Sequence, residues 1–176
     1  MTADERRADA LRAVLARLIP DDATGPGALE AGVDDYVLRR YAGPLGTEAG
    51  AYAGWLDELD RTSIEAHGAR FAEVDAAAQD AMLETLEARG LEAPEARRSA
   101  GFFETVLRHA REGMFGDPAH GGNRDGVGWD LLGYPDARRV WTREEQAVDV
   151  VILPRRPRSA LPPTLPAPAV PPGAGA

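Results

Sequence analysis

The side chains best suited to chemistry gather in one glycine-rich segment, residues 115–135. Its candidate ligands and proton carriers are Asp117, His120, Asn123, Asp125 and Asp130. Carboxylate and amide oxygens on such a loop could hold a hard cation, and Asp117, His120 and Asn123 could together form an acid–base centre. The alternating acids of a calcium loop are absent, and a zinc site would need His109 as a further ligand. A stand-alone metal or acid–base enzyme is therefore one interpretation of this loop.

The same loop also has a structural and binding interpretation. Asp117 before Pro118 is typical of a capped turn, Asn123 tolerates a left-handed backbone, and glycines allow close backbone approach. Trp129 and Tyr134 are residue types that anchor protein interfaces, although Trp129 could instead belong to the core of this domain. The loop therefore predicts a partner-binding surface made of Asp117, Pro118, His120, Gly121, Gly122, Asn123, Trp129, Tyr134 and Pro135.

The composition of the chain excludes several other kinds of catalytic and cofactor-binding site. The 176 residues include no cysteine and no lysine, which excludes a thiol nucleophile, a Schiff-base lysine and the lysine of a phosphate-binding loop. The loop glycines lack the spacing of a dinucleotide-binding fingerprint, and neither a Gly-x-Ser-x-Gly motif nor a doubled Glu-x-x-His pattern occurs. Outside the loop alternative, we expect no catalytic residue, cofactor or metal in this chain.

The charge of the chain is acidic and unevenly distributed. The formal net charge is −9, and every acidic residue precedes position 150. An acidic balance argues against nucleic acid or an anionic membrane as the main partner. A membrane-spanning helix needs about 20 consecutive apolar residues, and the apolar runs here are far shorter, so direct membrane insertion is not expected.

Helical periodicity defines the elements that must position the loop. The main signals are a Thr2–Glu5 capping box, an apolar face that begins at Leu29, a C-terminal cap at Gly90 and a helix end at Gly113. The expected helices cover residues 2–19, 29–42, 47–67, 69–89 and 94–113. Thr142 and Glu145 predict a further capping box, followed by a short helix to about residue 149.

These patterns predict an all-α fold, an irregular bundle of five or more helices that carries a long glycine-rich loop. We expect a helical domain over residues 1–150 and a separate tail over residues 151–176. Eight of the 23 residues from Pro154 onward are proline, which is typical of an extended or disordered segment rather than of a core.

The loop resembles a known family. Residues 116–123 read GDPAHGGN, followed by Gly128-Trp129 and by Gly133-Tyr134-Pro135, and this series resembles the small subunit, subunit 3, of gluconate 2-dehydrogenase. The family signature is DP-x-x-GGN, then GW, then GYPG; Asp136 stands where the last glycine is expected. Residues 18–22, residues 25–28, Tyr36 and Phe71 extend the resemblance, which covers roughly residues 10 to 136.

This resemblance implies an accessory subunit. In such complexes a separate large subunit of the glucose–methanol–choline (GMC) oxidoreductase type binds flavin adenine dinucleotide (FAD) and oxidises a sugar or sugar acid, and a cytochrome c subunit can accept the electrons. The small subunit holds no cofactor and supports the folding, stability or export of the large one. A free-standing helical binding module is a further alternative to this interpretation.

The resemblance also bears on the compartment. Many family members carry an amino-terminal twin-arginine leader, whereas this sequence begins at its first expected helix. The expectation is therefore a cytoplasmic protein, or an exported one if the partner carries the signal.

Overall fold

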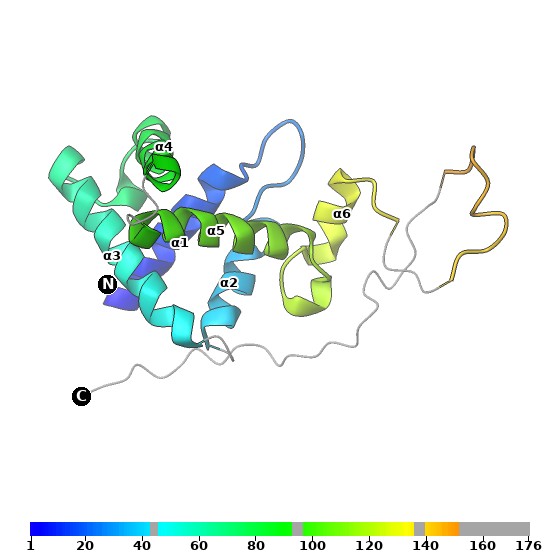
Figure 1. Cartoon of the computed structure of the whole chain (residues 1–176), viewed down its shortest axis with the longest axis horizontal. Coiled ribbons are helices and arrows are strands. Elements are labelled where there is room, and N and C mark those ends of the chain that lie inside the picture. Colours follow the sequence, from blue (N-terminus) through cyan, green and yellow to red (C-terminus); the bar gives the residue numbers. More distant parts are fainter. Residues whose placement is uncertain (43–45, 93–96, 136–139, 152–176) are drawn as a thin grey trace.

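The described parts of the chain fold into α-helices. The computed structural model describes residues 1–42, 46–92, 97–135 and 140–151, and within these residues it contains no β-strand (Figure 1). The helices are α1 (Ala3–Leu18), α2 (Val33–Ala42), α3 (Gly46–His67), α4 (Ala76–Glu92), α5 (Arg97–Phe115) and α6 (Val127–Leu131), with 3₁₀ turns η1 (Phe71–Glu73), η3 (Pro118–His120) and η4 (Arg124–Gly126). The predicted all-α bundle is confirmed. No described helix has the length and hydropathy required to cross a membrane.

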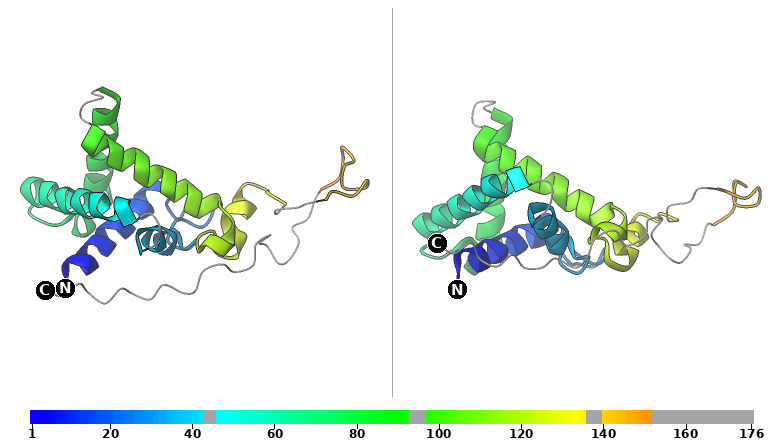
Figure 2. Two further views of the ribbon diagram at one scale, coloured as in Figure 1. Left: turned by 60° about the horizontal axis from the view of Figure 1, so that its bottom comes forward. Right: turned by 90° about the horizontal axis from the view of Figure 1, so that it is seen from below.

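Helix α5 is the element around which the others are arranged. It runs along the molecule, with α3 and α4 toward one end and α2 and α6 toward the other (Figures 1 and 2), and it packs against all five of the other helices. Its buried side chains recur every three or four residues, as an amphipathic helix requires. They are Phe102, Phe103, Val106, Ala110 and Met114, and they join buried residues of α1, α2 and α3 in one core.

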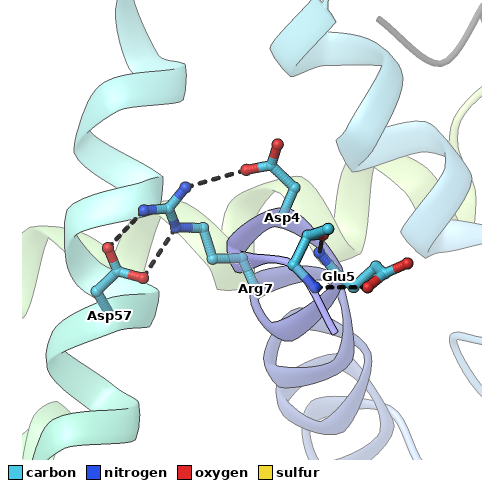
Figure 3. A network of polar contacts seen from close by, with 5 residues as sticks. Asp4, Glu5, Arg7 and Asp57 are labelled. Carbon is cyan, nitrogen blue, oxygen red and sulfur yellow. Dashed lines mark hydrogen bonds and ion pairs between the residues drawn. The ribbon is translucent and has the colours of Figure 1, made fainter. Parts of the chain in front are cut away.

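Helix α1 begins where its capping box predicts. Thr2 N–H donates to Glu5 Oε2 at 2.6 Å, and Glu5 N–H donates to Thr2 Oγ1 at 3.2 Å (Figure 3). These bonds satisfy backbone donors that the first turn of a helix leaves free. The predicted capping box is confirmed.

Two bidentate ion pairs join α1 to its neighbours. Arg7 donates from Nε and Nη2 to the carboxylate of Asp57 on α3, at 2.8 and 2.7 Å (Figure 3), and Arg17 makes the same fork to Asp80 on α4, at 2.7 Å for both bonds. In each pair the arginine hydrogen bond lowers the pKa of the aspartate below its ordinary value. The planar guanidinium suits this geometry, because its donors match the two carboxylate oxygens.

Several predicted helix boundaries need correction. Helix α2 begins at Val33 rather than near Leu29, because Gly32 adopts a left-handed backbone (φ 72°), and Leu29 is consequently exposed. The expected fourth helix is interrupted after η1, where Phe71 is buried, and α4 starts only at Ala76.

Two glycines expected to end helices lie inside them. Helix α4 continues through Gly90 to Glu92, and α5 continues through Gly113 to Phe115. One glycine costs a helix only about 1 kcal/mol, and at Gly113 packing against neighbouring helices outweighs this cost. Gly113 is buried at such a contact, since a Cβ there would lie 2.9 Å from the Tyr36 ring.

The capping box at Thr142 forms, but no helix follows it. Thr142 N–H donates to Glu145 Oε2 at 2.9 Å, and Glu145 N–H donates to Thr142 Oγ1 at 3.3 Å, yet residues 143–149 form turns. Short helices depend on burying an apolar face, and Val148 here is 99% exposed. The predicted helix at this position is therefore wrong.

Some predicted features lie outside the described residues. They are the Gly43-Pro44 helix end, Pro94 at the start of the fifth helix, Asp136, and all of the proline-rich tail except Val151.

Removal of the Thr2 hydroxyl should weaken α1. The Thr2→Ala variant loses the acceptor for Glu5 N–H, and loss of such a cap costs about 1 kcal/mol of unfolding free energy. Thr142→Ala removes an equivalent bond from a segment without a helix, so its effect should stay within about 0.5 kcal/mol. Urea denaturation followed by circular dichroism measures both; equal losses would contradict this account of α1.

Acid should weaken the α1–α4 link. Because the folded-state pKa of Asp80 is lowered, the pair stabilises the fold above the ordinary aspartate pKa of about 3.9, and this contribution is lost as pH falls through the lowered value. Asp80→Asn should therefore reduce the difference in urea midpoint between about pH 7 and about pH 3. Glu87→Gln, which changes an exposed α4 carboxylate that has no ion pair among the described residues, is the control and should leave that difference unchanged.

Candidate functional site

The loop after α5 folds back onto the carboxyl end of that helix (Figure 2). Trp129 Nε1 donates to the carbonyl of Phe115 at 2.8 Å, and Asn123 Nδ2 donates to the carbonyl of Gly116 at 2.8 Å. The last carbonyls of a helix have no partners within the helix. Side chains of the loop thus satisfy the carbonyl groups at which α5 ends.

Asn123 connects the end of α5 to the start of α6. Its side chain is fully buried, and its Oδ1 accepts a hydrogen bond from Gly128 N–H at 2.8 Å while its Nδ2 binds the Gly116 carbonyl. The Asn123 backbone is left-handed (φ 45°, ψ 45°), which confirms the expectation from its residue type. Both ends of the Asn123 amide therefore serve the fold of the loop.

Two loop glycines allow the backbone to come close to α5. A Cβ at Gly122 would lie 2.2 Å from the Gly113 carbonyl oxygen, and a Cβ at Gly128 would lie 1.9 Å from the Met114 carbonyl oxygen. Real Cβ atoms do not approach an oxygen so closely, so only glycine fits at either position. The close approach that the sequence predicts is thus made, at Gly122, to this chain's own helix.

The DPAHGG segment forms one short turn. Asp117 accepts a hydrogen bond from Ala119 N–H at 2.9 Å, Pro118 occupies the first turn of η3, and Gly121 ends it with a left-handed backbone (φ 99°). This confirms that Asp117 caps a turn before Pro118. His120, in contrast, is exposed.

Trp129 and Tyr134 have different surroundings. Trp129 is only 5% exposed, whereas Tyr134 is 42% exposed and packs edge-on against the Trp129 ring, with 5.2 Å between ring centroids. Trp129 therefore belongs to the packing of this domain, the alternative that the sequence leaves open for it. Partner contact through the nine predicted residues stays a prediction, and Tyr134 and His120 are the exposed side chains among them.

Two leucines next to these residues are more exposed than their type suggests. Leu131 and Leu132 are 38% and 63% exposed, although leucine is most often buried in folded proteins. Leu131 lies two residues after the buried Trp129, and at about 3.6 residues per turn this spacing places it on the other side of α6. The sequence holds no comparable signal for the exposure of Leu132.

The structure does not assemble the proposed metal ligands. His109 is buried in the core, where its Nδ1 lies 2.7 Å from the Tyr52 hydroxyl, and the two rings are stacked. The carboxylate of Asp117 and the amide of Asn123 both bind backbone groups. Across the described ranges, no group of three or more His, Cys, Asp or Glu side chains is arranged to hold a metal ion.

A hollow lies between α3, α4 and α5, away from the loop. Its volume is about 820 Å³, and it is lined mainly by apolar side chains, including Trp55, Met82, Leu86 and Phe102. Phe102 is buried, and Trp55 is only partly covered.

Addition of one methyl group at Gly128 should destabilise the domain. In Gly128→Ala the new Cβ meets the Met114 carbonyl, which is helix backbone and cannot turn aside, and overpacking of this kind costs about 3 kcal/mol of unfolding free energy. Gly54→Ala makes the same chemical change on α3, where no atom lies within 4 Å of the new Cβ. The control should therefore be neutral or more stable by up to about 1 kcal/mol. Thermal melts of both variants test this, and a Gly128→Ala variant that melts like the parent would contradict it.

Comparison with known proteins identifies a family. A family model described as gluconate 2-dehydrogenase subunit 3 matches residues 5–135, from the first turns of α1 to the end of the GYP segment. Among curated proteins and among solved structures, no match was found. Because the family model spans most of the chain, including every helix of the structure, this chain belongs to the gluconate 2-dehydrogenase subunit 3 family.

Proposed function

We propose that this chain is a non-catalytic accessory subunit that binds and stabilises the large subunit of a flavin-dependent sugar or sugar-acid dehydrogenase or oxidase. Membership of a subunit family supports an assembly with other chains. In this proposal the large subunit is of the GMC type and carries FAD, a cytochrome c can accept the electrons, and this chain contributes no catalytic group.

The observation that carries the proposal is how the signature residues are used. Trp129, Asn123, Gly122 and Gly128 hold the loop against α5. A loop made rigid in this way presents a fixed surface, and such loops on a scaffold commonly carry the function of a domain. The signature is therefore better suited to shaping a surface than to moving protons.

That surface ends in exposed apolar side chains. Leu131, Leu132 and Tyr134 follow the buried Trp129 within five residues and remain open to solvent. Neighbouring exposed apolar residues are typical of interaction sites, and aromatic anchors often supply much of the binding energy. We assign the contact with the large subunit to this group, which we call the α6 patch.

Binding through the α6 patch would stabilise the large subunit by mass action. A ligand that binds only the folded state raises the free energy of unfolding in proportion to the logarithm of its concentration over Kd. A subunit without any catalytic group can thus increase the yield of active flavoprotein.

A charge placed in the α6 patch should weaken the complex. We expect Leu132→Asp to raise the Kd for a GMC-type flavoprotein subunit about tenfold or more, because a carboxylate would be buried in an apolar contact. Co-expression followed by pull-down and titration of the purified pair measures this effect.

Ile64→Asp is the matched control, since Ile64 is an exposed apolar residue on α3 and should tolerate the change. If the parent chain and the flavoprotein do not associate at all, the proposed function is wrong. If they associate and both variants bind equally well, the α6 patch is not the contact.

A further inference from the structure

Arg39, in the last turn of α2, combines partial burial with the lack of an ion-pair partner. Its Nε is buried and has no hydrogen-bond acceptor, and no ion pair among the described residues includes it. Eight other arginines in the same residues do pair with aspartate or glutamate. They are Arg7, Arg12, Arg17, Arg40, Arg61, Arg70, Arg108 and Arg124. The chain has 29 acidic residues, yet this partly buried arginine lacks an acceptor among the described residues. This favours an acceptor that another molecule supplies.

The signature loop holds the Arg39 side chain in place. A Cβ at Gly121 would lie 3.1 Å from Cδ, Nε and Cζ of Arg39, so the guanidinium rests against the backbone of the DPAHGGN turn. Gly121 has φ 99°, a conformation that other residues rarely adopt. An arginine restrained in this way loses less side-chain entropy when it binds an anion.

The acids that α2 itself carries are engaged elsewhere. Asp34 accepts a hydrogen bond from Arg12 at 3.0 Å, and Asp35 accepts one from Arg124 at 3.2 Å. Neither carboxylate is therefore left for Arg39.

Glu112 on α5 is engaged as well. It accepts a hydrogen bond from the Tyr36 hydroxyl at 2.9 Å and lies 3.3 Å from Arg40 and 3.7 Å from Arg108. Burial, reinforced by this hydrogen bond, raises the pKa of Tyr36 above its ordinary value, so its hydroxyl remains a donor. One carboxylate thus serves two guanidinium groups, so Glu112 is not left for Arg39 either.

We propose that Arg39 binds a carboxylate side chain of the large subunit, an inference that rests on the proposed function. The Nη groups of Arg39, unlike its Nε, are not among the buried unsatisfied atoms, and they supply the donors. Two parallel hydrogen bonds from a guanidinium to a carboxylate are short, directional and strong. The partner chemistry that Arg39 recognises is therefore acidic.

A carboxylate fixed on a protein suits this position better than a free anion. Arg39 lies in the last turn of α2, where the helix dipole places partial negative charge. The dipole weakens the binding of a small anion by a single guanidinium, whereas a protein carboxylate is delivered by the rest of the interface at high effective concentration.

The test is the Kd of the full chain for the co-expressed flavoprotein subunit, measured at several sodium chloride concentrations. Arg39→Gln should raise Kd about thirtyfold and make it less dependent on salt, because a desolvated charge pair is lost. Arg89→Gln makes the same change in net charge at an exposed position on α4 and should change Kd less than about twofold. Arg39→Lys keeps the positive charge but lacks the planar guanidinium, so its Kd should lie between the Kd of the parent and that of Arg39→Gln.

Each outcome separates this inference from the proposed function. No association by the parent chain refutes the proposed function. A parent complex that Arg39→Gln leaves intact, or one that Arg89→Gln weakens equally, overturns the role of Arg39 alone. Thermal melts identify any variant that fails to fold. If Arg39→Gln does not fold, Arg39→Lys is the deciding variant. Binding by Arg39→Lys equal to that of the parent would overturn the proposed pair of hydrogen bonds from Arg39 to a carboxylate. Sodium gluconate supplies a free carboxylate. If it displaces the large subunit more than sodium chloride does at equal ionic strength, the choice of a protein carboxylate is overturned.

Discussion

The carbonyl groups at the end of α5 set the position of the loop and of α6, which follow them in the chain. A helix cannot satisfy its own last carbonyls, and in a packed domain these groups must find donors. Here the donors are the indole of Trp129 and the amide of Asn123, both reached within the next 14 residues. Since Gly122 and Gly128 contact the same helix end without side chains, the loop has one position against the bundle, and the α6 patch acquires a defined place on the surface.

The helices are joined to one another by arginine as well as by the core. The chain has no lysine, and its arginines form forked pairs across helices, α1 to α3 through Arg7 and α1 to α4 through Arg17. These pairs are partly exposed, so each adds little stability by itself. What they add is orientation, because the planar fork constrains how two helix faces meet. Arg39 differs from them in having no such partner within the described residues.

Much of the fold can be predicted from local pattern. The Thr2–Glu5 box and the helix-period stripe of α5 depend on neighbouring residues only, and both occur as predicted. The errors arise where a local signal competes with packing. Gly113 is a permissive residue, and the burial of the α5 face against α2 carries that helix past it. At Thr142 the signal was present and the apolar face was missing, so the cap formed without a helix.

In the candidate site, too, some features follow from the local sequence and others from packing. The sequence by itself determined the helical class, the special backbone of Asn123, the cap at Asp117 and the family, because residue types and spacings along the chain carry that information. Only the tertiary structure decided that Trp129 is buried and Leu132 exposed, and that Arg39 rests against the loop without a carboxylate. Those outcomes depend on contacts between elements that are distant in the sequence. Such contacts are set by the packing of the whole core rather than by any local pattern.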